Sequence, residues 1–443
     1  MRRGPRVFHF VFDAKGLTRW GGLVLFREFC KSLRLRYFLQ HQVTWPPYHH
    51  RGYHPADLFL AHIFAITAGV GRIENTQSLL HNGLLPPILG LPEFPHRDTL
   101  RTFLWRFDKR SLRSLQVAHD KFRAELLRRF GAVYSAVVDA DTTHLKVYGK
   151  QEGVAVGYIP KLRHKRPSYA PILSSEGRTG ITLGMELRAG NVHPTTGAWN
   201  FLQPILEKIP SSVATSRTRL RLDGAFYDRY LVQKLDEERL GYVIVASLRS
   251  GELKRRVISA RYREFAKGWE AAEFTYPLTG FKREHHYAAV RRPIGFESEE
   301  AQRNLFTHKR YTYHRVLLFG NLDLQPEGVW RFYCDRACQE LLIREFKDSL
   351  FMAKIPTRSF WANAAYMEMI LWAYDLVLGF QNLCLPKRVR HWNISTLRRE
   401  LWWIAARWVK SGNRNILWLP KRYPQKDLFF SVQAAASKVK PLI

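Results

Sequence analysis

Four polar residues around position 340 have the types and the spacing for chemistry on a phosphate. If this stretch is a helix, with about 100° of rotation per residue, four side chains fall within an arc of roughly 60°: Tyr333, Arg336, Glu340 and Lys347. The other acid nearby, Glu345, would point roughly 140° away from Glu340. A carboxylate among cations suits a group that binds a metal ion beside a phosphate, although a surface helix with salt bridges has the same composition.

Two more carboxylates lie in a segment with the composition of a β-strand. The residues from Ala132 to Tyr148 are rich in β-branched and aromatic types, and their alternation places Asp139 and Asp141 on one face. Acids inside an apolar strand cost free energy unless a partner compensates them. A divalent cation would compensate both acids, whereas an arginine would compensate one.

A further carboxylate ends a second predicted strand. Leucine and arginine alternate from Thr218 to Leu222, and Asp223 then stands directly before a glycine. A helix and another strand are expected over residues 228–247. This β-α-β order predicts an α/β sheet, in which ligands gather at the strand ends.

The composition indicates a folded protein with a polyanionic partner. Hydrophobic residues make up 46% of the 443 residues and aromatic residues 14%, which supports a real core. Lysine and arginine number 70 against 38 acids, so the formal net charge is +32. Such an excess favours nucleic acid as the partner, with a membrane surface as the weaker alternative.

Three features favour a cytoplasmic protein without a membrane anchor. The basic N-terminus is not followed by the apolar segment of a signal peptide. The most apolar segment, Phe360–Phe380, contains Glu368 and Asp375 and is therefore expected to be a buried helix. Four cysteines are few for this length, as is typical of a reducing compartment.

The segments around the predicted sheet differ in character. Residues 1–130 favour helices, and one basic helix has an apolar stripe that suits a helix-turn-helix recognition element or any basic amphipathic helix: Leu100, Phe103, Leu104 and Phe107. Short strands are expected between about 250 and 330. The C-terminal part is rich in tryptophan and basic residues, with a helix expected over Thr396–Lys410, which suits either nucleic-acid binding or core packing.

The ordered set of acids resembles the DDE transposases of bacterial insertion sequences. The resemblance rests on four pieces: Asp-Ala-Asp-Thr-Thr at 139–143, Tyr-Gly-Lys-Gln-Glu-Gly at 148–153, Leu-Asp-Gly-Ala-Phe-Tyr at 222–227, and the spaced Tyr, Arg, Glu and Lys of the YREK signature. It covers roughly residues 130–350. The sequence looks most like the members with a β insertion between the second Asp and the Glu. The resemblance implies an α/β fold with an RNase H-like mixed-sheet core and helical flanks.

The resemblance also implies a metal-dependent reaction on DNA. Asp141, Asp223 and Glu340 would bind two Mg²⁺ or Mn²⁺ ions about 3.5–4 Å apart, for cleavage at transposon ends and strand transfer into target DNA. Asp141 is chosen because the family's first aspartate tends to precede Thr directly, and Asp139 is the alternative first ligand. Tyr333, Arg336 and Lys347, the other residues of the signature, would contact DNA. The partners would be double-stranded terminal repeats and target DNA, with a homodimer to hold two ends.

These expectations divide the chain into five regions and leave two alternative functions open. The regions are a helical DNA-binding region (1–130), the first part of the core (131–250), a β-rich insertion (251–330), a catalytic helix (331–355) and a basic aromatic helical region (356–443). One rival is a PD-(D/E)xK nuclease, because Arg344-Glu-Phe-Lys347 contains Glu-x-Lys. That class needs this motif on a strand. The other rival is a DNA-binding protein that descends from a transposase and has no catalysis.

Overall fold

The computed structural model describes ten segments of the chain: residues 13–47, 52–80, 93–131, 135–159, 164–209, 217–248, 250–278, 281, 284–296 and 311–442. The chain divides into two compact units. One unit is formed by Met1–His119 together with Glu345–Ile443, and the other by Asp120–Arg344. The second unit is called the sheet unit here, and the first the helical unit.

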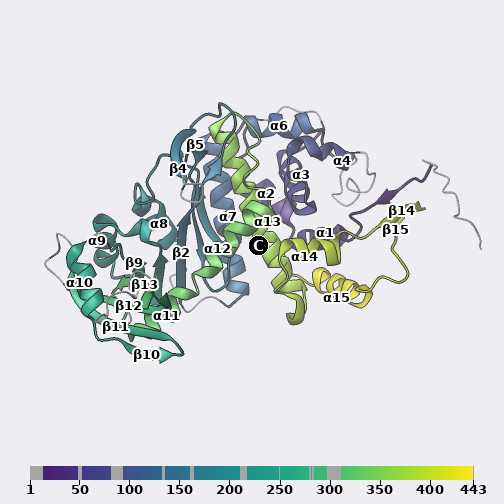
Figure 1. Cartoon of the computed structure of the whole chain (residues 1–443). Helices are drawn as coiled ribbons and strands as arrows, with labels where there is room; N and C mark the ends of the chain where they lie inside the picture. The colour runs from purple at the N-terminus through teal and green to yellow at the C-terminus, as the bar shows by residue number, and fades with distance from the viewer. Residues whose placement is uncertain are drawn as a thin grey trace, which may run out of the picture. The chain divides into compact units, whose positions relative to one another are not determined.

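A mixed nine-stranded sheet dominates the described part of the sheet unit (Figure 1). Its strands, in chain order, are β2 Ala136–Thr142, β6 Ile172–Glu176, β7 Thr182–Glu186, β8 Thr218–Leu222, β9 Gly241–Val245, β10 Arg263–Ala266, β11 Trp269–Pro277, β12 Glu284–Phe296 and β13 Tyr311–Gly320. A smaller sheet has the order β3-β5-β4, from Leu145–Lys146, His164–Tyr169 and Ala155–Ile159.

The order of the central strands is that of an RNase H-like core. The large sheet runs β10-β11-β12-β13-β9-β8-β2-β6-β7. Within it, β2, β8 and β9 are parallel neighbours, whereas β6 and β7 pair in antiparallel fashion beyond β2. The strands expected between 250 and 330 are present, and β13 pairs with β9. They therefore continue the core sheet at one edge, and the fold class predicted from the sequence is confirmed.

The two faces of the sheet differ in polarity because side chains alternate along each strand. One face is apolar, with Val138, Ala140, Leu220 and Leu222 fully buried. It packs in one core with residues of three helices: α8 Ala198–Leu206, α9 Arg229–Glu237 and α10 Gly251–Ser259. Full burial of one such leucine contributes about 1.5–3 kcal/mol. The opposite face carries Asp139, Asp141 and Arg221.

Helix α11, Pro326–Cys334, lies against this second face. Its Val329, Trp330, Phe332 and Tyr333 pack on Val243, Ala288 and Leu318. Helix α12, Ala337–Asp348, follows after a break at Asp335 and Arg336. The prediction of one continuous helix from Tyr333 to Lys347 is therefore wrong. The backbone tightens there, because the Arg336 and Gln339 amides donate to carbonyls only three residues earlier, at 2.9 Å each.

The helical unit is built around a buried helix, α13 Phe360–Cys384, as expected for that segment. Its other helices are α1 Leu23–Ser32, α2 Leu35–Gln42, α3 Pro55–Ala68, α4 Gln77–Leu80, α6 Arg97–Trp105, α14 Ile394–Leu397 and α15 Lys426–Ser437, with short turns η1 Ile73–Thr76, η6 Lys387–Val389 and η7 Arg398–Trp402. Helix α7, Lys109–Arg129, contains the boundary between the two units, and in the sheet unit a short turn, η4, spans Gly224–Phe226.

Among the described residues no single helix is long and apolar enough to cross a membrane. Helix α3 and the segment Ile73–Leu79 reach the required length and composition only together, as a pair bent by 93°.

Two features of the helical unit bear on the predictions. The apolar stripe of α6 is buried as expected, at Leu100, Phe103 and Leu104. The helix expected over Thr396–Lys410 is wrong, because the chain leaves its helical turns after Trp402 and forms strand β14, Ala406–Ser411. This strand pairs with β15, Arg414–Trp418, and with β1, Leu17–Thr18.

Candidate active site

The register of two parallel strands brings two of the predicted aspartates together. Strands β2 and β8 pair so that Asp139 lies opposite Arg221 and Ala140 opposite Leu222. One position further along, Asp141 is the next residue of β2, and Asp223 follows the end of β8. Asp223 leaves the strand geometry and caps the turn after it, accepting a hydrogen bond from the Ala225 amide at 3.0 Å. Both carboxylates therefore sit at the same end of the sheet.

The guanidinium of Arg336 lies among all three predicted metal ligands. Its Nη2 atom is 2.9 Å from an Asp141 carboxylate oxygen and 3.9 Å from one of Asp223, and its Nη1 atom is 3.7 Å from one of Glu340. The side chain is 7% exposed. Its position in the break between α11 and α12 lets it reach the strand ends. One cation thus serves three carboxylates that come from three separate stretches of sequence.

Burial dominates the electrostatics of this cluster. It raises the pKa of the Asp141 carboxyl to about 6, against the opposing effect of Arg336. Burial also raises the pKa of the Asp223 carboxyl, again opposed by Arg336. The neighbouring carboxylates add to both increases, because like charges at short range disfavour ionisation. The site therefore carries an excess of negative charge that a single arginine does not neutralise.

The donor set fits a hard divalent cation better than zinc. The three side chains offer carboxylate oxygens only, and Mg²⁺ and Mn²⁺ prefer such ligands. Glu340 is the outlying member, because its side chain is 72% exposed. Within the described part of the chain, no three His, Cys, Asp or Glu side chains converge closely enough to hold an ion. Asp141 and Asp223 would form the fixed part of such a site, and Glu340 would have to turn inward from α12.

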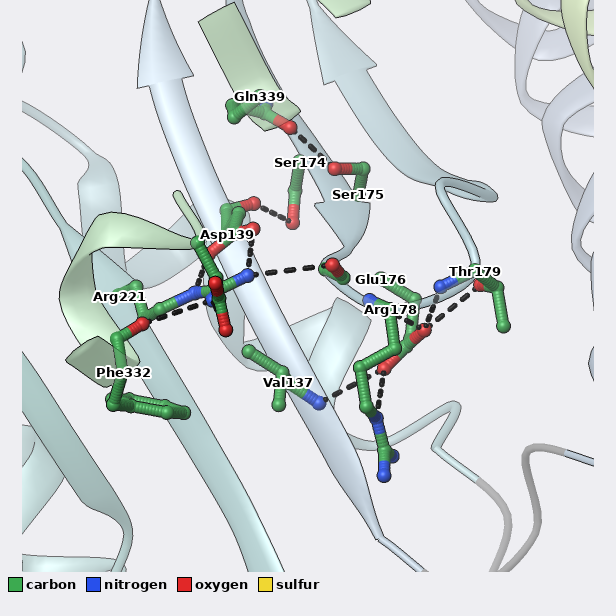
Figure 2. A network of polar contacts seen from close by, with 12 residues as sticks. Val137, Asp139, Ser174, Ser175, Glu176, Arg178, Thr179, Arg221, Phe332 and Gln339 are labelled. Carbon is green, nitrogen blue, oxygen red and sulfur yellow. Dashed lines mark hydrogen bonds and ion pairs between the residues drawn. The ribbon is translucent and has the colours of Figure 1, made fainter. Parts of the chain in front are cut away.

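The N-terminal turn of α12 is fastened to the sheet beside this cluster. The buried Gln339 accepts a hydrogen bond from the Ser175 hydroxyl, and its amide nitrogen donates to the Leu173 carbonyl at 3.4 Å. Both partners belong to β6, which neighbours β2. Figure 2 shows the contact of Gln339 with Ser175. Gln339 directly precedes Glu340, so this contact fixes the backbone from which the Glu340 side chain extends.

The alternative first ligand, Asp139, is held by an arginine. Arg221 donates to both Asp139 carboxylate oxygens at 2.7 Å, and both side chains are almost completely buried. The same guanidinium donates to the Phe332 carbonyl in α11 at 3.0 Å (Figure 2). Such a two-pronged pair suits a structural role. Asp141 forms an ion pair with Arg336, at 2.9 Å, but no two-pronged hydrogen-bonded pair within the described residues, so the geometry favours Asp141 over Asp139 as the ligand.

A glycine makes room for this buried pair. A Cβ atom on Gly177 would lie 2.2 Å from the Arg221 Nη2 atom and 2.5 Å from an Asp139 oxygen. Neither distance is compatible with a side chain at this position. Sequence reasoning missed Arg221, Gln339 and Gly177. The alternation that places Arg221 on the same face as Asp223 was the available signal for the first of them.

Tyr333 lies beside the acidic cluster, whereas Lys347 and Glu345 lie further along α12. Tyr333 is the penultimate residue of α11 and is partly buried. Burial raises the pKa of its hydroxyl, nearby Arg336 opposes this increase, and Asp223 and Asp141 add to it. Lys347 lies seven residues after Glu340 in α12, about two helical turns further along. Glu345 accepts a hydrogen bond from the Ile394 amide at 2.9 Å and so has a structural contact. Because the Glu-x-Lys motif is helical, the PD-(D/E)xK interpretation is wrong.

A comparison with known protein families agrees with the arrangement of these acids. Residues 4–441 match the family model described as "Transposase DDE domain group 1". The match spans nearly the whole chain, including both units. A comparison with curated proteins finds no match.

Proposed function

We propose that this chain, which belongs to the transposase DDE domain family, cleaves DNA at transposon ends and transfers the cut strand into target DNA. The observation that carries the proposal is the contact of one buried arginine with three carboxylates from β2, the end of β8 and α12. Clustered acids at strand ends cost free energy in the fold, and a reaction on phosphodiesters gives a reason for them.

The proposal gives each group in the cluster a role. Asp141, Asp223 and Glu340 would hold two Mg²⁺ or Mn²⁺ ions. Ions bound there would activate a water or a DNA 3′-hydroxyl for attack and stabilise the departing oxygen. Arg336 would hold a phosphate of the DNA, because within the described residues its Nε group has no hydrogen-bond partner and its Nη2 group has ion pairs with the two aspartates but no hydrogen bond. Tyr333 and Lys347 would contact the backbone near the cut.

Double-stranded DNA would be the substrate in both steps. The net charge of +32 favours association with phosphates, and the helical region before residue 130 would contribute to end recognition. Two ends must be held together for transfer, so a homodimer is the expected working form.

A donor plasmid tests the proposal directly. It would carry the gene between its own natural flanks, and it would be incubated with the protein and a target plasmid in Mg²⁺ or in EDTA. We expect cuts at both flanks and joined donor-target products in Mg²⁺ only. Cuts scattered over the plasmid would indicate a nuclease of another kind. Binding to the flanks without any metal-dependent cut would indicate a DNA-binding protein without catalysis.

A further inference from the structure

The small sheet of the helical unit, formed by β1, β14 and β15, has an exposed face to which the proposed function assigns no role. Strand β1 pairs with β14 so that Leu17 lies opposite Arg407, and β14 pairs with β15 so that Arg407 lies opposite Trp418 and Val409 opposite Ile416. Residues directly opposite each other point to the same face. One face of this ribbon therefore carries Leu17, Arg407, Val409, Ile416 and Trp418, together with Ser411 and Arg414 at its tip.

The apolar side chains on this face are unusually open to solvent. Leu17 is 54% exposed, Ile416 38% and Trp418 64%. They belong to the large hydrophobic residues that the folded chain leaves exposed, and the register collects three of them on one small surface. A grouped apolar surface of this kind indicates a partner rather than chance exposure.

The charge around this face points to the class of partner. From Ala406 to Lys426 the chain has no Asp or Glu, and it contains six cations: Arg407, Lys410, Arg414, Lys421, Arg422 and Lys426. A second copy of a chain with a net charge of +32 would meet this surface with a like charge. A polyanion meets it with the opposite charge.

We propose that the β14–β15 ribbon docks against a groove of double-stranded DNA. This inference rests on the proposed function and adds a DNA-binding surface to it. Arg407 and the tip residue Arg414 lie about 14 Å apart along the ribbon, at about 3.4 Å per residue. The major groove is about 12 Å wide and admits a two-stranded ribbon. The two arginines contact phosphates on either side. Ile416 contacts the groove between them, and Trp418, which lies opposite Arg407, contacts the edge of the groove beside that arginine.

The basic helix α6 is a weaker candidate for the same task. Arg101, its central cation, donates to Asp98 at 2.8 Å and to Glu74 at 2.7 Å. Arg106, just after the helix, donates to the Pro47 carbonyl at 2.8 Å. These side chains would have to break contacts within the protein to reach DNA. The ribbon has no acid among its residues that would compete in this way.

Salt-dependent binding of the full chain to a 30-bp duplex from the element's own flank tests the ribbon. The variants are R407Q/R414Q, W418A, and K410Q as a matched control, because Lys410 is exposed on the opposite ribbon face. Each lost phosphate contact lowers the slope of log affinity against log salt by about 0.9. We expect the double variant to lose about 1.8 from the slope, W418A to bind at least fivefold more weakly with an unchanged slope, and K410Q to match wild type.

Four outcomes separate this inference from the proposed function. The expected pattern, with unchanged thermal midpoints, supports the ribbon as a DNA-binding surface. Wild-type affinity and slope in R407Q/R414Q and W418A would overturn the ribbon alone. Wild-type DNA binding in those variants, with a changed oligomeric state or lost binding to anionic vesicles, would assign the face to another partner. Wild-type protein that binds no duplex would overturn both proposals.

Discussion

Arg336 defines the site at the scale of single residues. It is the one described cation within 4 Å of Asp141, Asp223 and Glu340 alike. Burial raises the pKa of both aspartates despite this neighbour, so the free protein holds its carboxylates at a cost in stability. The spacing of Arg336 and Glu340 predicted their proximity correctly. It could not reveal that Arg336 lies in a helix break, because no glycine or proline marks one.

The variant Asp141→Asn tests this cost in stability, and the test does not depend on catalytic activity. The pKa of Asp141 in the folded protein is about 6, above its ordinary value near 3.9. The stability linked to the neutral carboxyl is therefore present below about pH 4 and is lost as pH rises through about 6. In metal-free buffer at pH 8, we expect the variant to exceed wild type by roughly 2–3 kcal/mol in free energy of unfolding.

Denaturant titrations at pH 4 and pH 8 measure this difference. The gain should be absent near pH 4, where both proteins carry a neutral group. The exposed Asp323→Asn serves as the control, with a change within about 0.5 kcal/mol at either pH. An Asp141→Asn variant less stable than wild type at pH 8 would contradict the account of a carboxyl whose pKa is raised by burial.

At the scale of elements, the Asp139–Arg221 pair joins β2, β8 and α11. The pair bridges two parallel strands, and Arg221 also binds the Phe332 carbonyl near the end of α11. This link sets where α11 ends, and hence where Arg336 begins its reach toward the aspartates. The alternation of the sequence placed both aspartates on one face. It could not decide which aspartate has the arginine, since that depends on the strand register.

Double replacement separates the structural role of this pair from its charge. Asp139→Leu or Arg221→Met alone leaves one buried charge without its partner, and we expect a loss of about 3–5 kcal/mol in free energy of unfolding. The combined variant removes both charges, so most of that loss should return. Unfolding by denaturant measures all three proteins. Additive losses in the double variant would contradict a direct, buried pair.

Gly177→Ala probes the same junction with a single methyl group. The added Cβ would lie within 2.2 Å of Arg221 and 2.5 Å of Asp139, so the pair must shift. We expect a loss of about 1–3 kcal/mol, as for other overpacked sites. Gly251→Ala is the matched control, because a Cβ there meets nothing within 4 Å. Equal thermal midpoints for the two variants would show that the junction tolerates displacement.

For the molecule as a whole, the core sheet was predicted from the sequence, whereas the C-terminal ribbon was not. The β-α-β pattern predicted the α/β sheet, because apolar alternation and strand ends are local signals, whereas the RNase H-like core was implied by the resemblance to DDE transposases. The C-terminal ribbon was missed, although Gly412-Asn413 between β14 and β15 is a two-residue hairpin turn.

Metal-dependent cleavage by wild type, Glu340→Gln and Glu345→Gln tests the central claim most directly. All three proteins would be incubated with Mg²⁺ and DNA that carries the element's own ends, and binding would be measured in parallel. We expect Glu340→Gln to lose at least a hundredfold in cleavage rate while it binds the ends like wild type. Glu345→Gln should cleave within a few-fold of wild type, because Glu345 contacts the Ile394 amide. Cleavage by Glu340→Gln at the wild-type rate would contradict the assignment of the three carboxylates to one metal-binding site.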